Sequence, residues 1–180
     1  MKKHSILCRL AVVLLLSWVS AAFAADDNQI YYVQHSFYAY KHKFVTTNYH
    51  IDTLIPINSR AKITDMGGSE MEIQLPDMQN MEVTIKNIEK YTHKNMQEIK
   101  DRMLGKNKVD LGKFSKPIAD AIKTGQVKVG MTKKEVLLAY GYPPVHKTPS
   151  LDDSRWTYWK TKWNRVILTF QDGKLSNIRD

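Results

Sequence analysis

Residues 130–144 read GMTKKEVLLAYGYPP and predict a short helix that carries a signal at each end. At the start, Thr132 and Glu135 have the spacing of a capping box. In this motif the Thr hydroxyl accepts a hydrogen bond from the Glu backbone N–H, and the Glu carboxylate accepts one from the Thr backbone N–H. At the other end, Gly141 closes the helix and Pro143 prevents its continuation. We expect this helix to be the best-defined element of the chain.

The residues after this helix predict an antiparallel sheet of three strands, over 155–160, 165–170 and 174–179. Apolar and polar residues alternate in the middle strand, as expected where one face of a sheet is buried. The dipeptide Asp172-Gly173 is a strong hairpin signal before the last strand. In the first strand, alternation places Trp156 and Tyr158 on one face and Trp159 on the other.

Two more helices are expected before residue 130. The first runs over 92–104, with Thr92 as its N-cap, and the second begins at Ser115 and ends at Gly125. These helices and the sheet set residues 92–180 apart from the segment that precedes them.

Residues 25–91 predict a small β-rich domain that opens with a run of aromatic residues between Tyr31 and Tyr49. Strand candidates lie at 44–50, 60–64, 70–75 and 81–87, and 53–59 is expected to be a loop. Several short strands at this spacing suggest a small, partly open barrel. The segment loosely resembles bacterial SH3-like modules.

Residues 1–24 have the features of a cleaved secretory signal peptide: a basic start, a short apolar core, and Ala22-Phe23-Ala24 before the expected cleavage site. The net charge of +9 for the whole chain falls to +6 when the three basic residues of this segment are removed. The one cysteine, Cys8, precedes the apolar core, so we expect a periplasmic mature chain with neither a disulfide nor a lipid-anchoring cysteine.

Residues 115–180 carry an ordered set of motifs that resembles the SmpA/OmlA (BamE-like) family of envelope proteins. The set is GMTKKEV at 130–136, GYP at 141–143, WTY at 156–158 and DGK at 172–174. The resemblance implies an α+β unit of two layers, with helices packed on a three-stranded antiparallel sheet. It also implies a non-enzymatic role in supporting outer-membrane protein assembly, with some contact to anionic phospholipid. The chain departs from the family in lacking the lipidated cysteine and in carrying the β-rich segment 25–91.

The sequence contains few features of a catalytic or metal-binding site. The mature segment has no cysteine and no G-x-S-x-G motif, so we expect no catalytic nucleophile. Its histidines, including His35, His42 and His50, have no ligand spacing such as H-x-x-x-H, and we expect neither a metal site nor a cofactor. Met66, Met71, Met78 and Met81 leave Cu(I) as an alternative, although methionine is also a common core residue.

The candidate binding residues lie mainly on and around the predicted sheet. Aromatic residues are enriched at binding hot spots, and basic neighbours suit an acidic or lipid partner. The predicted partner-binding residues are Trp159, Trp163, Arg155, Lys160, Lys162 and Arg165, together with His146 in the long loop 141–153.

The sequence thus predicts an α+β protein of the periplasm in which an SH3-like domain, 25–91, precedes a BamE-like domain, 92–180. We expect it to bind an envelope protein or anionic lipid and not nucleic acid, because it is secreted. One alternative is a module that binds cell-wall peptide or glycan through the aromatic run. The same fold also serves secreted inhibitor-type recognition proteins, and an enzyme of unknown type is the remaining alternative.

Overall fold

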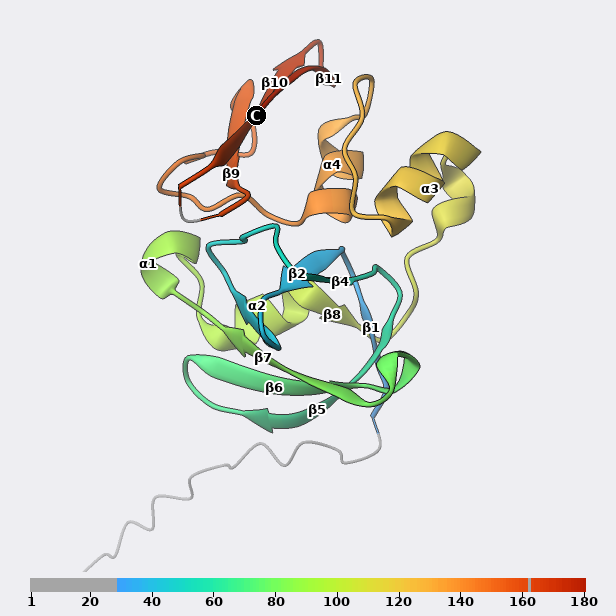
Figure 1. Cartoon of the computed structure of the whole chain (residues 1–180), viewed down its shortest axis with the longest axis vertical. Helices are drawn as coiled ribbons and strands as arrows, with labels where there is room; N and C mark the ends of the chain where they lie inside the picture. The colour runs from blue at the N-terminus through green and yellow to red at the C-terminus, as the bar shows by residue number, and fades with distance from the viewer. Residues whose placement is uncertain (1–28, 162) are drawn as a thin grey trace, which may run out of the picture.

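The structure is a computed structural model that describes residues 29–161 and 163–180 (Figure 1). The predicted signal peptide, 1–24, and Lys162 lie outside these residues. The fold is α+β, as expected, and combines a curled six-stranded sheet with a three-stranded antiparallel sheet. Each sheet has its own hydrophobic core.

The larger sheet has the strand order β3-β7-β6-β5-β1-β8. Its strands are β1 (Tyr31–Val33), β3 (Lys43–Val45), β5 (Arg60–Met66), β6 (Glu70–Leu75), β7 (Met81–Lys86) and β8 (Leu104–Gly105). Neighbouring strands are antiparallel except for β3 and β7, which are parallel. The strand prediction for 70–75 is confirmed, and that for 81–87 is confirmed to within one residue.

Two strand predictions in this half are wrong. The segment predicted over 44–50 ends as a strand at Val45, because Asn48 has a φ of 55° and turns the chain. Thr53–Ile55, expected in a loop, forms β4 and pairs antiparallel with β2 (Phe37–Ala39). A three-residue strand depends on its partner for hydrogen bonds, and the partner is not visible in the local sequence.

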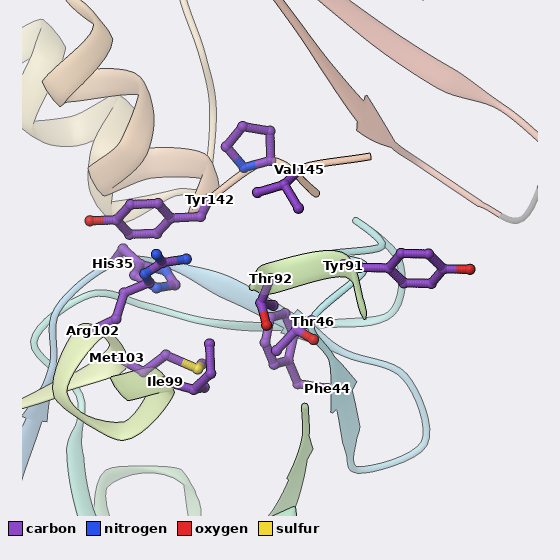
Figure 2. A pocket seen from close by; sticks show the side chains of 11 residues that line it. His35, Phe44, Thr46, Tyr91, Thr92, Ile99, Arg102, Met103, Tyr142 and Val145 are labelled. Atoms are coloured by element: carbon purple, nitrogen blue, oxygen red, sulfur yellow. The ribbon is translucent and has the colours of Figure 1, made fainter. Parts of the chain in front are cut away.

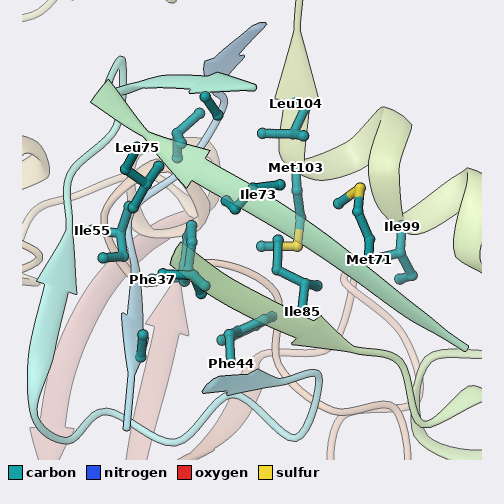
Figure 3. Packing of buried hydrophobic residues seen from close by; sticks show 14 of the residues in the cluster. Phe37, Phe44, Ile55, Met71, Ile73, Leu75, Ile85, Ile99, Met103 and Leu104 are labelled. Carbon is teal, nitrogen blue, oxygen red and sulfur yellow. The ribbon is translucent and has the colours of Figure 1, made fainter. Parts of the chain in front are cut away.

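The core of the six-stranded sheet includes a helix that we expected to open the second domain (Figure 3). Helix α2 (Met96–Met103) buries Met96, Ile99 and Met103 among Phe37, Phe44 and Met71 of the strands. Strand β8, directly after it, pairs with β1. This packing differs from the predicted division between 91 and 92, since residues 96–104 belong to the first core.

The predicted N-cap of this helix is wrong. Thr92 ends a separate short helix, α1 (Glu89–Thr92), and its hydroxyl donates to Asn87 Oδ1 at 2.9 Å. Asn95 caps α2 in its place: its Oδ1 accepts from the Glu98 N–H at 2.9 Å, and Glu98 Oε2 accepts from the Asn95 N–H at 3.0 Å. Asparagine is as good an N-cap as threonine, so the local sequence offered two starts.

The C-terminal half follows the prediction closely. Its elements are a 3-10 turn, η2 (Leu111–Lys113), helices α3 (Lys116–Lys123) and α4 (Lys133–Tyr140), and strands β9 (Arg155–Trp159), β10 (Arg165–Gln171) and β11 (Lys174–Arg179). The sheet order is β11-β10-β9, and both pairings are antiparallel. The capping box is present, with the Thr132 N–H donating to Glu135 Oε2 at 2.6 Å. Side chains of α3, α4 and the three strands share one core.

Hydrogen bonds tie the two halves together. Ser36 donates its backbone N–H to the Leu138 carbonyl and its hydroxyl to the Ile122 carbonyl, at 2.9 and 3.0 Å. Asn48 Nδ2 donates to the carbonyls of Tyr140 and Tyr142, at 2.8 and 3.0 Å. The chain at Tyr49 also forms a parallel bridge with Trp159, so β9 gains a neighbour from the first half.

Candidate functional site

Three of the predicted binding residues, Arg155, Trp159 and Arg165, lie on the side of the C-terminal sheet opposite its core. Trp156, Tyr158, Val166 and Leu168 point into the core and are fully buried or nearly so. The strand register then places Arg165 opposite Trp159 and Thr169 opposite Arg155 on the other face. Arg179 joins them from β11, since it pairs with Ile167. Alternation along three strands therefore gathers a tryptophan and three arginines on one surface.

One end of this surface is hollowed into a groove of about 340 Å³, which we call the basic groove. It is lined by Lys160, Trp163, Asn164, Arg165, Ile167, Arg179 and Asp180. The turn between β9 and β10 forms one wall, held by the Lys160 N–H donating to the Asn164 carbonyl at 2.9 Å. Trp163, at the tip of this turn, is 80% exposed.

The charges in the basic groove do not cancel. Lys160 forms an ion pair with Asp180. Among the residues that the structure describes, Arg165 and Arg179 have no ion pair with a carboxylate. The Arg165 guanidinium lies 6.0 Å from the Trp159 ring centroid, a weak cation–π contact. Two exposed guanidinium groups beside an exposed indole can bind carboxylates or phosphates while the ring covers apolar surface.

The remaining predicted residues are less central. Arg155 is exposed on the same face but does not line the groove. Trp159 is only half-exposed. Its carbonyl accepts the His50 N–H at 2.9 Å, so its backbone links β9 to the first half of the chain. His146 lies elsewhere: its ring packs on Tyr91 with centroids 4.4 Å apart. Nothing is described of Lys162.

A second hollow, of about 420 Å³, adjoins the basic groove and shares Lys160 and Asp180 with it. Its other residues come from both halves of the chain and include Tyr38, His50, Lys128, Tyr140 and Ile178. His50 stacks on Tyr140 with centroids 4.0 Å apart, and its Nε2 donates to the Tyr140 carbonyl at 3.0 Å. Burial lowers the pKa of His50 to about 4 and raises the pKa of Tyr140 to about 12, so both groups are neutral at pH 7.

A third hollow, which we call the tyrosine groove, has a volume of about 380 Å³ and is lined by Tyr38, Tyr40, Lys41, Lys43, Val45, Tyr49 and Ile51. Tyr38 also lines the second hollow, so the three hollows follow one another across the junction of the two halves. The aromatic run predicted at 31–49 is split: Phe37 and Phe44 are core residues, whereas Tyr38, Tyr40 and Tyr49 line this groove.

No local pattern in the sequence predicts the second hollow. Its residues are separated by up to 142 positions, from Tyr38 to Asp180. Only the aromatic run and the basic residues of 155–165 marked parts of the surface in advance. Arg179 could have been added from the alternation of the last strand, because it shares a face with Asn177.

No family model, curated protein or solved structure matches this chain. Within residues 29–161 and 163–180, no three His, Cys, Asp or Glu side chains are grouped so that they could hold a metal ion. In the same part of the chain, no helix is long and apolar enough to span a membrane.

Proposed function

We propose that this protein is a non-enzymatic binding protein of the cell envelope, and that it engages an acidic protein partner through the basic groove. The observation that supports this best is the arrangement of Arg165 and Arg179 beside the exposed Trp163. Within the described chain neither arginine is neutralised by a carboxylate, so both are available to one on a partner. Tryptophan and arginine, together with tyrosine, are the residue types enriched at binding hot spots.

Two features of the sequence support this proposal. Residues 115–180 resemble the SmpA/OmlA family, and residues 1–24 have the features of a secretion signal. Both favour a periplasmic protein that supports outer-membrane protein assembly or envelope integrity. The net charge of +6 expected after signal removal also suits an acidic partner, because opposite charge accelerates encounter. We also propose that the first half of the chain is an SH3-like module.

The tyrosine groove favours a second candidate function, the binding of cell-wall glycan or peptide. Tyr38, Tyr40 and Tyr49 offer aromatic faces with hydroxyl groups, and Lys41 and Lys43 add positive charge at the same place. Sedimentation with purified peptidoglycan tests this candidate. Retention that is lost in a Tyr40→Ala variant but kept in an Arg165→Gln variant would favour it over the basic groove.

Crosslinking in cells tests the first candidate. A photo-crosslinking amino acid is placed at Trp163, in the groove, and at Leu151, which is 38% exposed in a loop outside the groove. We expect a discrete envelope protein captured from position 163 alone, with capture lost when Arg165 and Arg179 are changed to Glu. Equal capture from both positions, or capture unchanged in the Glu variant, would contradict the proposal. Crosslinks to anionic lipid alone would show that the groove serves the membrane surface.

A further inference from the structure

A small notch lies on another part of the molecule, where α2 of the first core meets the chain leaving α4 (Figure 2). Most of its wall is apolar, with Phe44, Ile99, Met103 and Val145 contributing. Two polar side chains, Arg102 and His35, lie together beneath the ring of Tyr142. None of these residues lines the basic groove.

Arg102 is more than half buried, and among the described residues Glu98 favours its charge from a distance without forming an ion pair with it. Its guanidinium carbon lies 3.9 Å from the Tyr142 ring centroid. In the described part of the chain, its N–H groups have neither a hydrogen bond nor an ion pair. Loss of hydration lowers its pKa. Its nitrogens are not among the buried unpartnered atoms of the described residues, so they reach the surface and can donate to a carboxylate from outside the chain.

The nearest carboxylate on the same helix is already used. Glu98, one turn before Arg102, accepts from Lys94 Nζ at 2.9 Å through Oε1. Its Oε2 accepts from the Asn95 N–H at 3.0 Å in the capping box. Both oxygens are therefore held at the start of α2, and neither accepts a hydrogen bond from Arg102, which lines the notch.

His35, which also lines the notch, carries a second unsatisfied atom. Its ring is fully buried, and Nδ1 lies 3.2 Å from the Ser36 carbonyl, so the Nδ1 hydrogen is donated there. The other nitrogen, Nε2, is then a lone-pair acceptor, and it has no partner among the residues that the structure describes. The groups that face the ring are Arg102 on α2, Asn48 after β3, and Tyr142 after Gly141. Burial and the Arg102 charge hold the pKa of His35 at about 4.

Gly141 is required for this arrangement. It has a φ of 71°, and a Cβ at this position would lie 3.0 Å from His35 Nδ1 and 3.2 Å from Asn48 Nδ2. The absent side chain lets the backbone pass close to His35 and places Tyr142 over Arg102. The notch is therefore built by the helix terminus that the capping pattern predicts.

The volume of the notch limits what it can hold. It measures about 30 Å³. One water needs roughly 10–15 Å³ on this measure, so the notch accepts two or three water-sized atoms. A nucleotide or sugar needs a pocket of ~300 Å³ or more. A carboxylate has the right size, and its two oxygens match a guanidinium that has no acceptor.

We propose that the notch between Arg102 and His35 binds a carboxylate group from outside the chain, and that binding takes up one proton at His35 Nε2. The guanidinium donates to the carboxylate, and the protonated Nε2 donates to its second oxygen. The proton comes from solvent, because the neutral ring offers only a lone pair at Nε2. The carboxylate is the free C-terminus of a peptide or an acidic side chain, with its chain leaving through the mouth of the notch.

The test is NMR of the folded protein with ¹⁵N-labelled histidine and arginine. Three blocked tripeptides are titrated: one with a free C-terminal carboxylate, the same peptide as its C-terminal amide, and an amide with an internal Glu. Acetate and an equal ionic strength of sodium chloride are also titrated. We expect saturable shifts of the His35 ring and Arg102 Nε signals with the carboxylate probes. The C-terminal amide without Glu and sodium chloride should leave both signals unchanged.

Comparison of the dissociation constants of the free C-terminal peptide and the internal-Glu peptide shows which kind of carboxylate the notch prefers. The peptide that binds more tightly identifies the natural group. Binding should tighten from pH 7 to pH 5, by up to about tenfold per pH unit where one proton is taken up. The same spectra should show His35 Nε2 becoming protonated as the site fills.

Arg102→Met keeps an unbranched side chain and removes the charge, and we expect it to weaken carboxylate binding at least tenfold. Arg165→Met, in the basic groove, is the matched control and should leave this binding unchanged. His35→Gln should remove the pH dependence, and its fold is checked by thermal unfolding. Absence of saturable shifts in the wild type, or equal binding by Arg102→Met, would overturn the proposal and leave the notch as a water site. Neither result depends on the basic groove.

Discussion

Arg165 of β10 lies directly opposite Trp159 of β9, and its guanidinium is 6.0 Å from the indole centroid. This pair stands at the edge of the basic groove, where Arg165 and Arg179 meet Trp163. The inner face of the same strands is filled with core residues, whereas Arg165 and Arg179 are exposed on the outer face. Changes on the outer face can therefore test binding without unfolding the protein.

The first prediction concerns the two arginines. Arg165→Gln and Arg179→Gln should each weaken binding of the partner captured at Trp163 by roughly fivefold, which corresponds to ~1 kcal/mol. The dissociation constant of the purified pair checks this. The difference from wild type should shrink in 1 M salt, where the screening length falls to about 3 Å. Lys116→Gln on α3, with its side chain 86% exposed, is the control, and an equal loss there would show that net charge alone matters.

The second prediction concerns the capping box of α4. Thr132→Ala removes the hydroxyl that accepts from the Glu135 N–H, and should lower the free energy of unfolding by about 1 kcal/mol. Lys134→Ala, at an exposed position in the first turn of the same helix, is the matched control and should change little. Urea unfolding followed by tryptophan fluorescence measures both. A loss equal to that of the control would mean that packing, rather than the cap, defines the start of α4.

The third prediction concerns Asn48, which ties the first half to the end of α4. Its Nδ2 donates to the carbonyls of Tyr140 and Tyr142, and the side chain is buried. Asn48→Gly keeps the φ of 55° available and removes both hydrogen bonds, so we expect a loss of about 1–3 kcal/mol in the free energy of unfolding. Asn48→Ala adds backbone strain and should cost more.

Unfolding curves of the Asn48 variants also test how the halves are coupled. Circular dichroism reports the whole fold, and fluorescence reports the tryptophans at 156, 159 and 163 in the second half. We expect the two transitions to coincide in the wild type and to separate in Asn48→Gly. Coincident transitions in the variant would show that Ser36 and the Tyr49–Trp159 bridge are sufficient to couple the halves.

The fourth prediction concerns pH. The pKa of His50 is about 4 in the folded protein and about 6.5 when unfolded, so between these values the unfolded chain binds more protons. The free energy of unfolding should therefore fall as the pH drops from 6.5 to 4, by about 3 kcal/mol for this group. The pKa of His35 is also about 4 in the folded protein, so His35 should lower the free energy of unfolding over the same pH range.

Urea unfolding at a series of pH values measures this dependence. A His50→Gln variant should show a shallower fall between pH 6.5 and 4 than the wild type. His42→Gln, at an exposed position, is the control and should keep the wild-type slope. Identical slopes in all three proteins would place the acid sensitivity elsewhere, for example in the surface ion pairs.

The local elements of the second half could be predicted because their signals are short-range. The Thr132–Glu135 box spans four residues, and Asp172-Gly173 needs no distant partner to form a turn. The first half was less predictable because its strands are defined by their partners. The pairing of β3 with β7 is parallel and joins residues 41 positions apart, and β4 exists only beside β2.

The candidate site shows the same division. Alternation in 155–159 predicts Trp159 on the face opposite Trp156 and Tyr158, because a strand's period of two is a property of the local backbone. The structure shows Arg155 and Arg165, predicted as its basic neighbours, on the same face. His146 was grouped with them from its loop, but it packs on Tyr91 of α1. The path of a long loop depends on what it packs against, which the local sequence does not show.

The sequence by itself determined the helix over 133–140, the three-stranded sheet and its faces, and the basic character of the surface, because capping, hairpin turns and alternation act within a few residues. The tertiary structure alone decided that α2 packs in the first core and that Arg165 and Arg179 share a groove with Trp163. It also decided that His35 and Arg102 meet beneath Tyr142. These contacts join residues that are far apart in the chain, and they form because burial of apolar surface brings the two halves together.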